Sequence, residues 1–296
     1  PYGKTWAPDK KALGVGPKGA IIDKRFMLKG SYKEEAVTSR VNDGQLMFVL
    51  HMLSKMKDTE LGSRIASVHN GSALFTGDAG QGESEIRKYI IENDLLEAIV
   101  ALPNDMFYNT GIPTYIFLFT NRKAKNRRGK VQLINASSDK FYNKMRKALG
   151  KKRVEFLPEH IAEIERTFLS FEENEYSKIF DNEDFGYAQI TVNRPLKDEK
   201  GKSVTDSKGK PKPDPKLKDT ENIPLKEDIQ EFFEREELPF APDAWWDKKD
   251  TKIGYEINFA KYFYKHEPPR ALTEIAKDIF AIEQETDGLL KEIIEA

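Results

Sequence analysis

The stretch Leu95-Leu-Glu-Ala-Ile-Val-Ala-Leu102 is an apolar run, and a second one follows at Thr114-Tyr-Ile-Phe-Leu-Phe-Thr120. Pro103-Asn104 ends the first run, and both have the length and composition of buried strands. The loop of about ten residues between them has no helical pattern, whereas a parallel crossover normally needs a dozen or more residues, usually with a helix. We therefore expect the two runs to form an antiparallel hairpin at one side of a sheet.

The segments around this pair alternate between helical and strand-like patterns. Apolar residues recur at helical spacing over 45–57, and charged and apolar residues alternate as they do in a helix over 82–93. Short apolar runs at 64–69 and 131–134 are typical of strands. Strands that alternate with helices predict an α/β fold built on a layered sheet.

The composition limits the class of protein. The chain has 296 residues and a net charge of −1, with 39% hydrophobic and 33% charged residues, so it can bury a core under a strongly ionic surface. No stretch approaches the ~20 apolar residues that cross a bilayer, and no signal peptide is visible. Cysteine is absent and the four histidines are scattered, so neither disulfides nor a metal site are expected. The cytoplasm is the expected compartment.

The character of the sequence changes after the predicted strands. Residues 197–219 are rich in Lys, Asp, Gly and Pro and hold almost no large apolar groups, which favours a solvated loop or linker. We expect four parts: a sheet domain at 1–155, an extension packed on it at 156–195, a charged linker or loop at 196–222, and a mostly helical C-terminal region at 223–296.

The last segment has a heptad pattern. Its apolar positions are separated by alternating steps of three and four residues, interrupted by one polar position at Thr286. The pattern fits a helix packed on its own domain, and it fits equally a coiled coil with a partner subunit. The apolar positions are Leu272, Ile275, Ile279, Ile282, Leu289 and Ile293.

A basic run follows the second apolar strand. Such a run can contact nucleic-acid phosphates without reading bases, or it can be a solvated charged loop. The run consists of Arg122, Lys123, Lys125, Arg127, Arg128 and Lys130, and a second group of Lys144, Arg146, Lys147, Lys151, Lys152 and Arg153 extends it.

Several segments, taken in order, resemble the modification subunits of type I restriction-modification systems, which are N6-adenine DNA methyltransferases. Pro1-Tyr2-Gly3 resembles the end of the Asn-Pro-Pro-Tyr motif of that family. The other segments are Asp43-Gly-Gln-Leu46, Ser63-Arg-Ile-Ala-Ser-Val-His-Asn-Gly71, Gly82-Glu-Ser-Glu-Ile-Arg87, Leu96-Glu-Ala-Ile-Val-Ala-Leu-Pro103 with Phe107-Tyr-Asn-Thr-Gly-Ile112, Arg128-Gly-Lys-Val-Gln-Leu-Ile134, Glu175-Tyr-Ser-Lys-Ile-Phe-Asp181, Asp219-Thr-Glu-Asn222 and Lys252-Ile-Gly-Tyr-Glu-Ile257.

The resemblance implies an S-adenosylmethionine-dependent enzyme with a Rossmann-like sheet, of which 1–155 would be the C-terminal half of the catalytic domain. The family's glycine-containing cofactor loop and acidic ribose ligand would lie upstream of Pro1, because Gly14-Val-Gly16 follows no apolar strand. The 296 residues alone are therefore expected to show little methyl transfer. The implied partners are DNA, a specificity subunit, a second modification subunit and a restriction subunit, and the heptad tail is a candidate contact with the specificity subunit.

The chemistry implied by the resemblance is an in-line displacement. Adenine N6 is a poor nucleophile inside a base stack, so the base must be flipped out, at roughly a few kcal/mol. Stacking on an aromatic side chain returns ~1–3 kcal/mol, and the resemblance assigns that role to Tyr2, beside Pro1. The protein contributes position and electrostatics and needs neither a nucleophilic side chain nor a metal.

Two loops are candidates for further walls of the base pocket. Phe107 or Tyr108 could line it from the loop between the two apolar strands, where functional residues concentrate. The alternative is that both rings pack onto the edge of the sheet. Asn70 and Gly71 follow another predicted strand, and we expect them to line the same cleft.

Two other functions remain open. A non-catalytic assembly module would hold a DNA-binding complex together through the heptad tail, with a vestigial sheet. Another Rossmann-like nucleotide-binding enzyme is a weaker hypothesis, because the sequence shows no phosphate loop.

Overall fold

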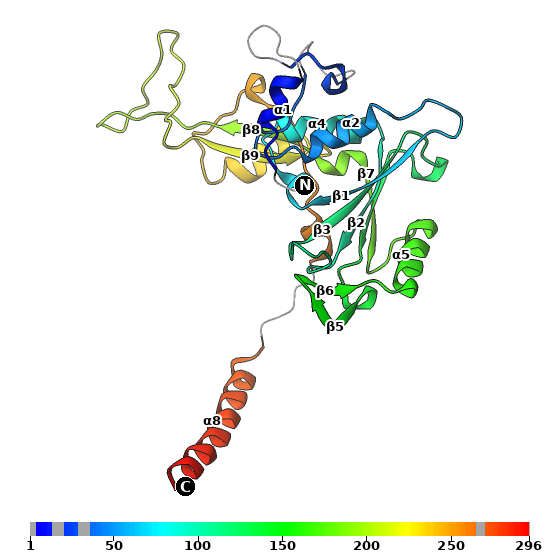
Figure 1. Ribbon diagram of the computed structural model, residues 1–296. Coiled ribbons are helices and arrows are strands. Elements are labelled where there is room, and N and C mark those ends of the chain that lie inside the picture. The colour runs from blue at the N-terminus through cyan, green and yellow to red at the C-terminus, as the bar shows by residue number, and fades with distance from the viewer. Residues whose placement is uncertain (1–3, 14–20, 29–35, 265–269, 296) are drawn as a thin grey trace. The chain divides into compact units, whose positions relative to one another are not determined.

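The computed structural model describes residues 4–13, 21–28, 36–264 and 270–295. The chain divides into two compact units, Pro1–Tyr262 and Phe263–Ala296. The first unit is built around a five-stranded sheet with the strand order β1-β3-β2-β4-β7 (Figure 1). Its strands are β1 (Arg64–Asn70), β2 (Leu96–Leu102), β3 (Thr114–Thr120), β4 (Lys130–Asn135) and β7 (Ser177–Asp181).

The predicted antiparallel hairpin is confirmed. β2 and β3 pair antiparallel, with Leu102 opposite Thr114. The hairpin lies inside the sheet and not at its side, because β3 also pairs antiparallel with β1 and β4 pairs parallel with β2. Every residue of β2 is buried, as expected for a strand with neighbours on both edges and cover on both faces.

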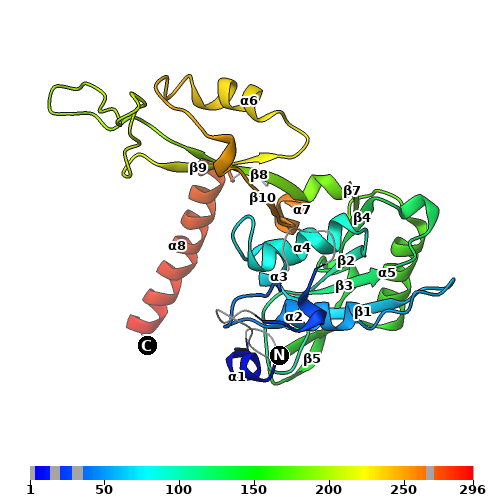
Figure 2. The same ribbon diagram turned by 90° about the horizontal axis from the view of Figure 1, so that it is seen from above.

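Helices cover the two faces of this sheet. α2 (Gln45–Leu53) and α4 (Gly82–Glu92) lie on one side and α5 (Pro158–Ser170) on the other (Figure 2). Val100 and Leu102 of β2 pack against Ile164 and Phe168 of α5 in one apolar cluster. The predicted α/β class is therefore confirmed, and the helices predicted at 45–57 and 82–93 are present with a shorter C-terminal end in the first case.

A second sheet, which the sequence did not predict, takes its strands from three of the expected parts of the chain. Its strands are β8 (Gly186–Val192), β9 (Asp219–Pro224) and β10 (Lys252–Tyr255), in the order β10-β8-β9. Helix α6 (Ile229–Phe232) and the π-helical turn Phe233–Glu237 cover it. The sheet is joined to the first through α4, since Arg87 Nε donates to the carbonyl oxygen of Tyr255 at 2.7 Å. The pattern of a single strand does not reveal partners so far away in sequence.

The expected domain boundaries differ from the observed ones. The segment predicted as an extension at 156–195 supplies strand β7 to the first sheet and β8 to the second. The segment predicted as a charged linker or loop at 196–222 forms a set of turns closed by β-bridges, and its last residues belong to β9. The remaining elements of the first unit include α1 (Ala7–Ala12), α3 (Ser72–Phe75) and the hairpin of β5 (Asn143–Leu149) and β6 (Lys152–Glu155).

Beyond α7 (Phe259–Phe263), the second unit consists mainly of helix α8 (Leu272–Glu295). Four residues of the predicted heptad seam, Leu272, Ile275, Ile279 and Ile282, are exposed. The side chains of Leu289 and Ile293 lie outside the described residues. Within the described part of the chain, no helix combines the length and apolar character that a membrane crossing requires.

Candidate functional site

The carboxyl ends of three parallel strands meet at one edge of the first sheet. β1 and β2 both run antiparallel to β3, and β4 runs parallel to β2, so Asn70, Leu102 and Asn135 end their strands at the same edge. Thr114 begins β3 there, opposite both Asn70 and Leu102. In open α/β sheets, ligands bind outside the carboxyl ends of the strands.

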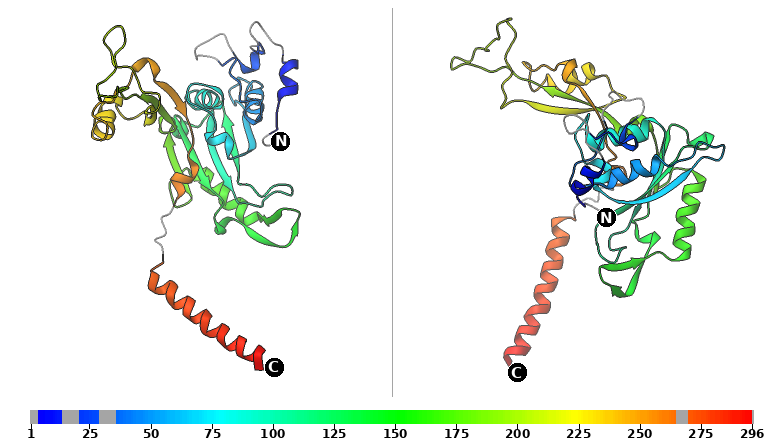
Figure 3. Two further views of the ribbon diagram at one scale, coloured as in Figure 1. Left: turned by 90° about the vertical axis from the view of Figure 1, so that its left-hand side faces the viewer. Right: turned by 45° about the horizontal axis from the view of Figure 1, so that its top comes forward.

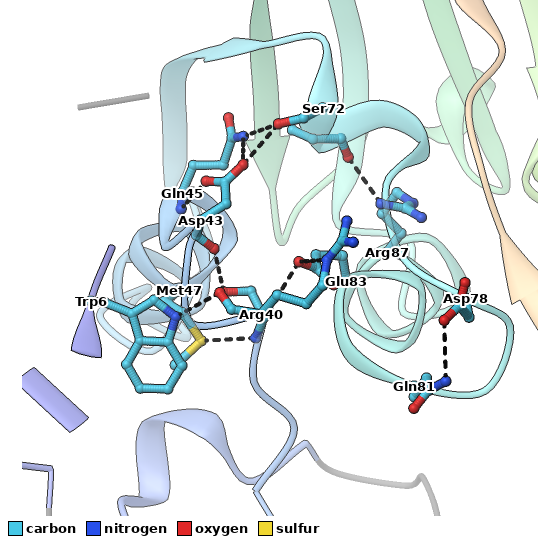
Figure 4. Close-up of polar contacts among 12 residues, drawn as sticks. Trp6, Arg40, Asp43, Gln45, Met47, Ser72, Asp78, Gln81, Glu83 and Arg87 are labelled. Carbon is cyan, nitrogen blue, oxygen red and sulfur yellow. Dashed lines mark hydrogen bonds and ion pairs between the residues drawn. The ribbon is translucent and has the colours of Figure 1, made fainter. Parts of the chain in front are cut away.

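A polar cluster lies at this edge, between α2 and the end of β1 (Figure 4). Gln45 Nε2 is 2.7 Å from Asp43 Oδ2, 2.8 Å from Asn70 Oδ1 and 2.6 Å from Ser72 Oγ. Ser72 Oγ is in turn 2.8 Å from Asp43 Oδ2 and 2.6 Å from Asn70 Oδ1. Asn70 Oδ1 also accepts from Ser72 N at 3.1 Å, which fixes the orientation of its amide. We call these four residues the edge cluster.

The edge cluster leaves one strong donor available. Asn70 is half-buried, and its Oδ1 already accepts from Gln45 and Ser72, while its Nδ2 group has no hydrogen-bond partner in the described part of the chain. Thr114 Oγ1 and Gln45 Oε1 are buried polar atoms that likewise find no partner among the described residues. Buried polar atoms are normally satisfied. This edge therefore has unused hydrogen-bonding capacity of the kind that orients a planar polar ligand.

The beginning of the described chain is anchored beside the edge cluster. Gly44 N donates to the carbonyl oxygen of Lys4 at 3.3 Å, and Trp6 N donates to Val41 O at 3.0 Å. The indole of Trp6 is buried and donates through Nε1 to Arg40 O at 2.9 Å (Figure 4). Pro1 and Tyr2, the residues predicted to be catalytic, lie outside the described residues.

The two aromatic candidates in the loop between β2 and β3, Phe107 and Tyr108, have different environments. Phe107 packs against the apolar cluster of Val100 and Leu102, which is the alternative that the sequence left open. Tyr108 is 58% exposed, and its ring centroid lies 5.6 Å from Lys152 Nζ. Its carbonyl oxygen accepts from Lys151 N at 2.9 Å, so the β5–β6 hairpin is bound to this loop. Gly150 permits the approach, because a Cβ there would stand 2.7 Å from the Tyr108 oxygen.

A sequence model of the family described as N-6 DNA Methylase matches residues 1–201. The chain belongs to that family. The resemblance drawn from the sequence motifs is thereby confirmed, and the strands of the first sheet, the edge cluster and the Tyr108 loop all lie within the matched residues.

The chain is also similar to individual members of type I restriction enzymes. It is 40% identical over 74 residues to the type I restriction enzyme MjaVII methylase subunit of Methanocaldococcus jannaschii, a match covering 25% of this chain and 12% of that protein. It is 38% identical over 111 residues to the MjaIX methylase subunit of the same organism, covering 36% and 19%. The chain thus spans far less than two thirds of these relatives.

A solved structure is also similar. The crystal structure of the type I restriction-modification system methyltransferase subunit from Streptococcus thermophilus is 24% identical, with a TM-score of 0.47. The match covers 62% of this chain and 34% of that chain.

Two of the six residues in the basic run that was predicted to contact phosphates are buried. Lys123 and Arg127 are buried, so the prediction is wrong for both. Lys123 Nζ lies 2.5 Å from Asp94 Oδ1, and burial lowers the pKa of Lys123 while Asp94 opposes that shift. Arg127 Nε lies 3.8 Å from Glu97 Oε1. A short polypeptide run cannot show which of its cations a neighbouring element covers.

The other four residues of the run divide into two pairs. Arg122 binds Asp58, and Lys130 Nζ lies 3.0 Å from Asp181 Oδ1. Lys125 and Arg128 are exposed and have no ion pair within the described ranges, so these two are the best placed of the run to contact phosphate.

The second basic group, on the β5–β6 hairpin, is better placed than the first run to contact phosphates. The β5–β6 hairpin carries six basic residues against one acidic residue over 143–155. None of the six forms an ion pair with another described residue, and the hairpin is bound to the Tyr108 loop through Arg153 N, which donates to Asp105 O at 2.9 Å. Unpaired cations beside the Tyr108 loop are suited to bind the backbone phosphates of a nucleic acid.

Two further features concern the binding of a cofactor and of a metal ion. Gly77 and Gly80 precede α4 and Gly82 begins it, all three with positive φ. The buried carboxylate of Glu83 packs against Gly77 in this turn and accepts from Arg40 N at 3.0 Å (Figure 4). A turn occupied by a protein carboxylate does not fit the carboxylate or ribose of S-adenosylmethionine. Among the described residues, no group of three or more His, Asp or Glu side chains could hold a metal ion.

Sequence reasoning found Asn70 and missed most of its partners. Asp43 and Gln45 appeared only inside the motif Asp43-Gly-Gln-Leu46, and Ser72 was not singled out. An Asn-Gly-Ser turn directly after a strand was the available signal. Gly71 precedes α3 and contributes backbone only, which leaves its place in a cleft a prediction.

Proposed function

We propose that the protein containing this chain methylates N6 of adenine at specific DNA sites, as the modification subunit of a type I restriction-modification complex, with S-adenosylmethionine as the methyl donor. Family membership over residues 1–201 supports methylation of DNA. The similar proteins named as type I restriction enzyme methylase subunits support the type of complex.

The observation that carries the proposal is the anchoring of the first described residues. Lys4 O accepts from Gly44 N, and Trp6 is hydrogen-bonded to Val41 and Arg40, so both lie beside the segment that leads into Asp43 and Gln45 of the edge cluster. We propose that Tyr2 stacks on the flipped adenine at this edge and that Pro1 is part of the catalytic turn. Such stacking would return ~1–3 kcal/mol of the cost of extruding the base.

The residues of this chain would orient the base. Asn70 Nδ2 is the available donor at the edge cluster, and we propose that it donates to a ring nitrogen of the adenine. Tyr108, exposed on the neighbouring loop, would form a second wall of the pocket. The bound cofactor supplies an electrophilic methyl carbon for the N6 lone pair. No described residue is assigned to that cofactor, because Glu83 closes the glycine turn before α4.

DNA and the other subunits would contact separate surfaces. We propose that the β5–β6 hairpin, together with Lys125 and Arg128, binds phosphates next to the pocket. The exposed seam of α8 is the candidate contact for a specificity subunit. A second modification subunit and a restriction subunit complete the proposed complex.

The test uses the full-length protein assembled with its specificity subunit. Transfer of a labelled methyl group to cognate DNA is measured for the wild type, Tyr2→Ala and Tyr2→Phe. We expect Tyr2→Ala to lose about 10-fold or more in transfer rate, equivalent to ~1.4 kcal/mol, while cofactor binding changes little and Tyr2→Phe stays close to wild type.

Equal losses of transfer and cofactor binding in Tyr2→Ala would contradict the stacking role. If the wild-type complex assembles and binds DNA but transfers no methyl group, the assembly-module alternative replaces the enzyme.

A further inference from the structure

Residues 195–218 contain three octapeptide repeats. The repeats are Pro195-Leu-Lys-Asp-Glu-Lys-Gly-Lys202, Ser203-Val-Thr-Asp-Ser-Lys-Gly-Lys210 and Pro211-Lys-Pro-Asp-Pro-Lys-Leu-Lys218. Each has Asp at its fourth position and Lys at its sixth and eighth positions. Repetition of the same three residues at the same spacing calls for a structural explanation.

The three repeats close into a ring. The second residues of the repeats are joined in a cycle, since Val204 N donates to Leu196 O at 2.8 Å, Lys212 N to Val204 O at 2.9 Å, and Leu196 N to Lys212 O at 2.8 Å. The β-bridges follow the same cycle, pairing the first residue of one repeat with the third residue of another: Pro195 with Pro213, Lys197 with Ser203, and Thr205 with Pro211. We call residues 195–218 the lysine trefoil.

Each loop of the lysine trefoil is fixed by its aspartate. Asp206 Oδ1 accepts from Lys208 N at 2.8 Å and from Lys210 N at 2.9 Å, and these donors hold the pKa of Asp206 below its usual value. Asp198 Oδ1 accepts from Lys200 N and Lys202 N, and Asp214 Oδ1 accepts from Lys216 N. The aspartates thus close the turns, and the lysine side chains at the sixth and eighth repeat positions are exposed.

The lysine trefoil is a local concentration of positive charge. It holds eight lysines and four acidic residues, a net charge of +4, in a chain whose total is −1. All eight lysines are exposed. Lys197 pairs with Asp243 at 2.9 Å. The six lysines at the sixth and eighth repeat positions have no ion pair within the described chain.

The trefoil stands apart from the sheet that carries the edge cluster. It projects from the ends of β8 and β9, in the yellow-green part of the ribbon (Figures 1 and 3). Its loops are supported by four prolines and by the hydrogen bonds of the ring, so little backbone entropy remains to be lost when they bind a partner.

We propose that the lysine trefoil is a second nucleic-acid site, which binds the phosphate backbone of duplex DNA independently of sequence. Lysine is a point charge suited to phosphate. The trefoil has no arginine for bidentate contacts with guanine and no aromatic ring for stacking, so it would hold DNA without reading it. The partner, DNA, rests on the proposed function, and the binding site itself is additional to the pocket.

The experiment measures binding of the full-length protein to a duplex of unrelated sequence, without cofactor, from about 50 to about 200 mM salt. The test variant replaces Lys200, Lys202, Lys208 and Lys210 by Gln. If two to four of these lysines contact phosphates, the salt dependence of log Kd should flatten by about 2–4, at ~0.9 per phosphate. Affinity at the lowest salt should fall at least about 10-fold.

Matched controls separate position from net charge. Lys208→Gln with Lys210→Gln is compared with Lys248→Gln and Lys249→Gln, an exposed pair outside the trefoil that loses the same charge. Only the trefoil pair should change the dependence of log Kd on salt concentration. Replacing the four test lysines by Arg should restore binding, which excludes misfolding as the cause.

An unchanged slope in the quadruple variant overturns the proposal. Unchanged DNA binding with loss of subunit assembly would overturn it too, in favour of an acidic protein partner. Failure of methyl transfer with a normal slope change would instead count against the catalytic proposal alone, so the two failures are distinguishable.

Discussion

Replacing Arg127 by Ala tests whether the basic run after β3 is structural. The Arg127 side chain is 7% exposed and that of Glu97 is 2% exposed, and the two form a buried ion pair. Arg127 Nη1 donates to Gln132 Oε1 at 3.1 Å, and Nη2 donates to the carbonyl oxygen of Phe168. The guanidinium lies 4.2 Å from the ring centroid of Phe168 and 4.3 Å from that of Phe171.

The contacts that Arg127→Ala removes determine how far the free energy of unfolding falls. Removing one partner of a buried ion pair costs ~3–5 kcal/mol, because the other charge stays buried without compensation. Glu97 would keep Arg64, whose Nη2 lies 3.2 Å from Glu97 Oε1 on a largely exposed side chain, which favours the lower end. The lost cation–π contacts add ~0.5–1 kcal/mol each. We therefore expect Arg127→Ala to lower the free energy of unfolding by about 4 kcal/mol.

Urea denaturation followed by circular dichroism measures this loss, and Arg128→Ala is the matched control. Arg128 is adjacent, exposed and without an ion pair in the described chain, so its replacement should change stability by less than ~0.5 kcal/mol. The reasoning is refuted if Arg127→Ala unfolds within ~1 kcal/mol of the control and loses DNA affinity while folded. That result would restore the phosphate role predicted from the sequence.

Three further predictions concern the edge of the sheet. Gly150→Ala should release the β5–β6 hairpin and weaken DNA binding more than Gly129→Ala, because both have positive φ but only a Cβ at 150 meets backbone; limited proteolysis of the hairpin and a DNA titration check this. Asn70→Asp should reduce methyl transfer about 10-fold, or ~1.4 kcal/mol, because a donor becomes an acceptor; a larger loss of cofactor binding than of transfer would contradict it. Burial lowers the pKa of His69 from 6.5 to about 4. Between these two pH values the unfolded state therefore binds more protons than the folded state. The free energy of unfolding should fall by at most ~3 kcal/mol as the pH drops from 6.5 to 4. Thermal melts of His69→Leu should show a weaker dependence on pH in that window than those of the wild type.

Local patterns predicted the first sheet well and its surroundings poorly. The strands at Leu96–Leu102 and Thr114–Thr120 could be predicted because both are nearly continuous apolar runs. The length of the loop between them indicated their antiparallel pairing. The three-stranded sheet of β8, β9 and β10 was missed, because its strands are separated by long segments and two of them carry polar residues on an open face. Strand pairing at such separation depends on packing and not on local propensity.

The candidate site shows the same division. Asn70 could be named from the turn that follows β1, but its partner Gln45 comes from a helix 25 residues earlier. Phe107 and Tyr108 are adjacent aromatic residues that the sequence could not distinguish. One packs under α5 and the other is 58% exposed.

The sequence by itself determined the α/β class, the hairpin of β2 and β3, and the family, because hydrophobic periodicity and ordered motifs are properties of a linear chain. Only the tertiary structure decided which cations are available to a partner. Arg127 is covered by α5, the β5–β6 hairpin stays exposed beside the Tyr108 loop, and three repeats close into the lysine trefoil. Burial and pairing depend on contacts between residues far apart in the chain, and these contacts determine whether a charge is structural or free to bind.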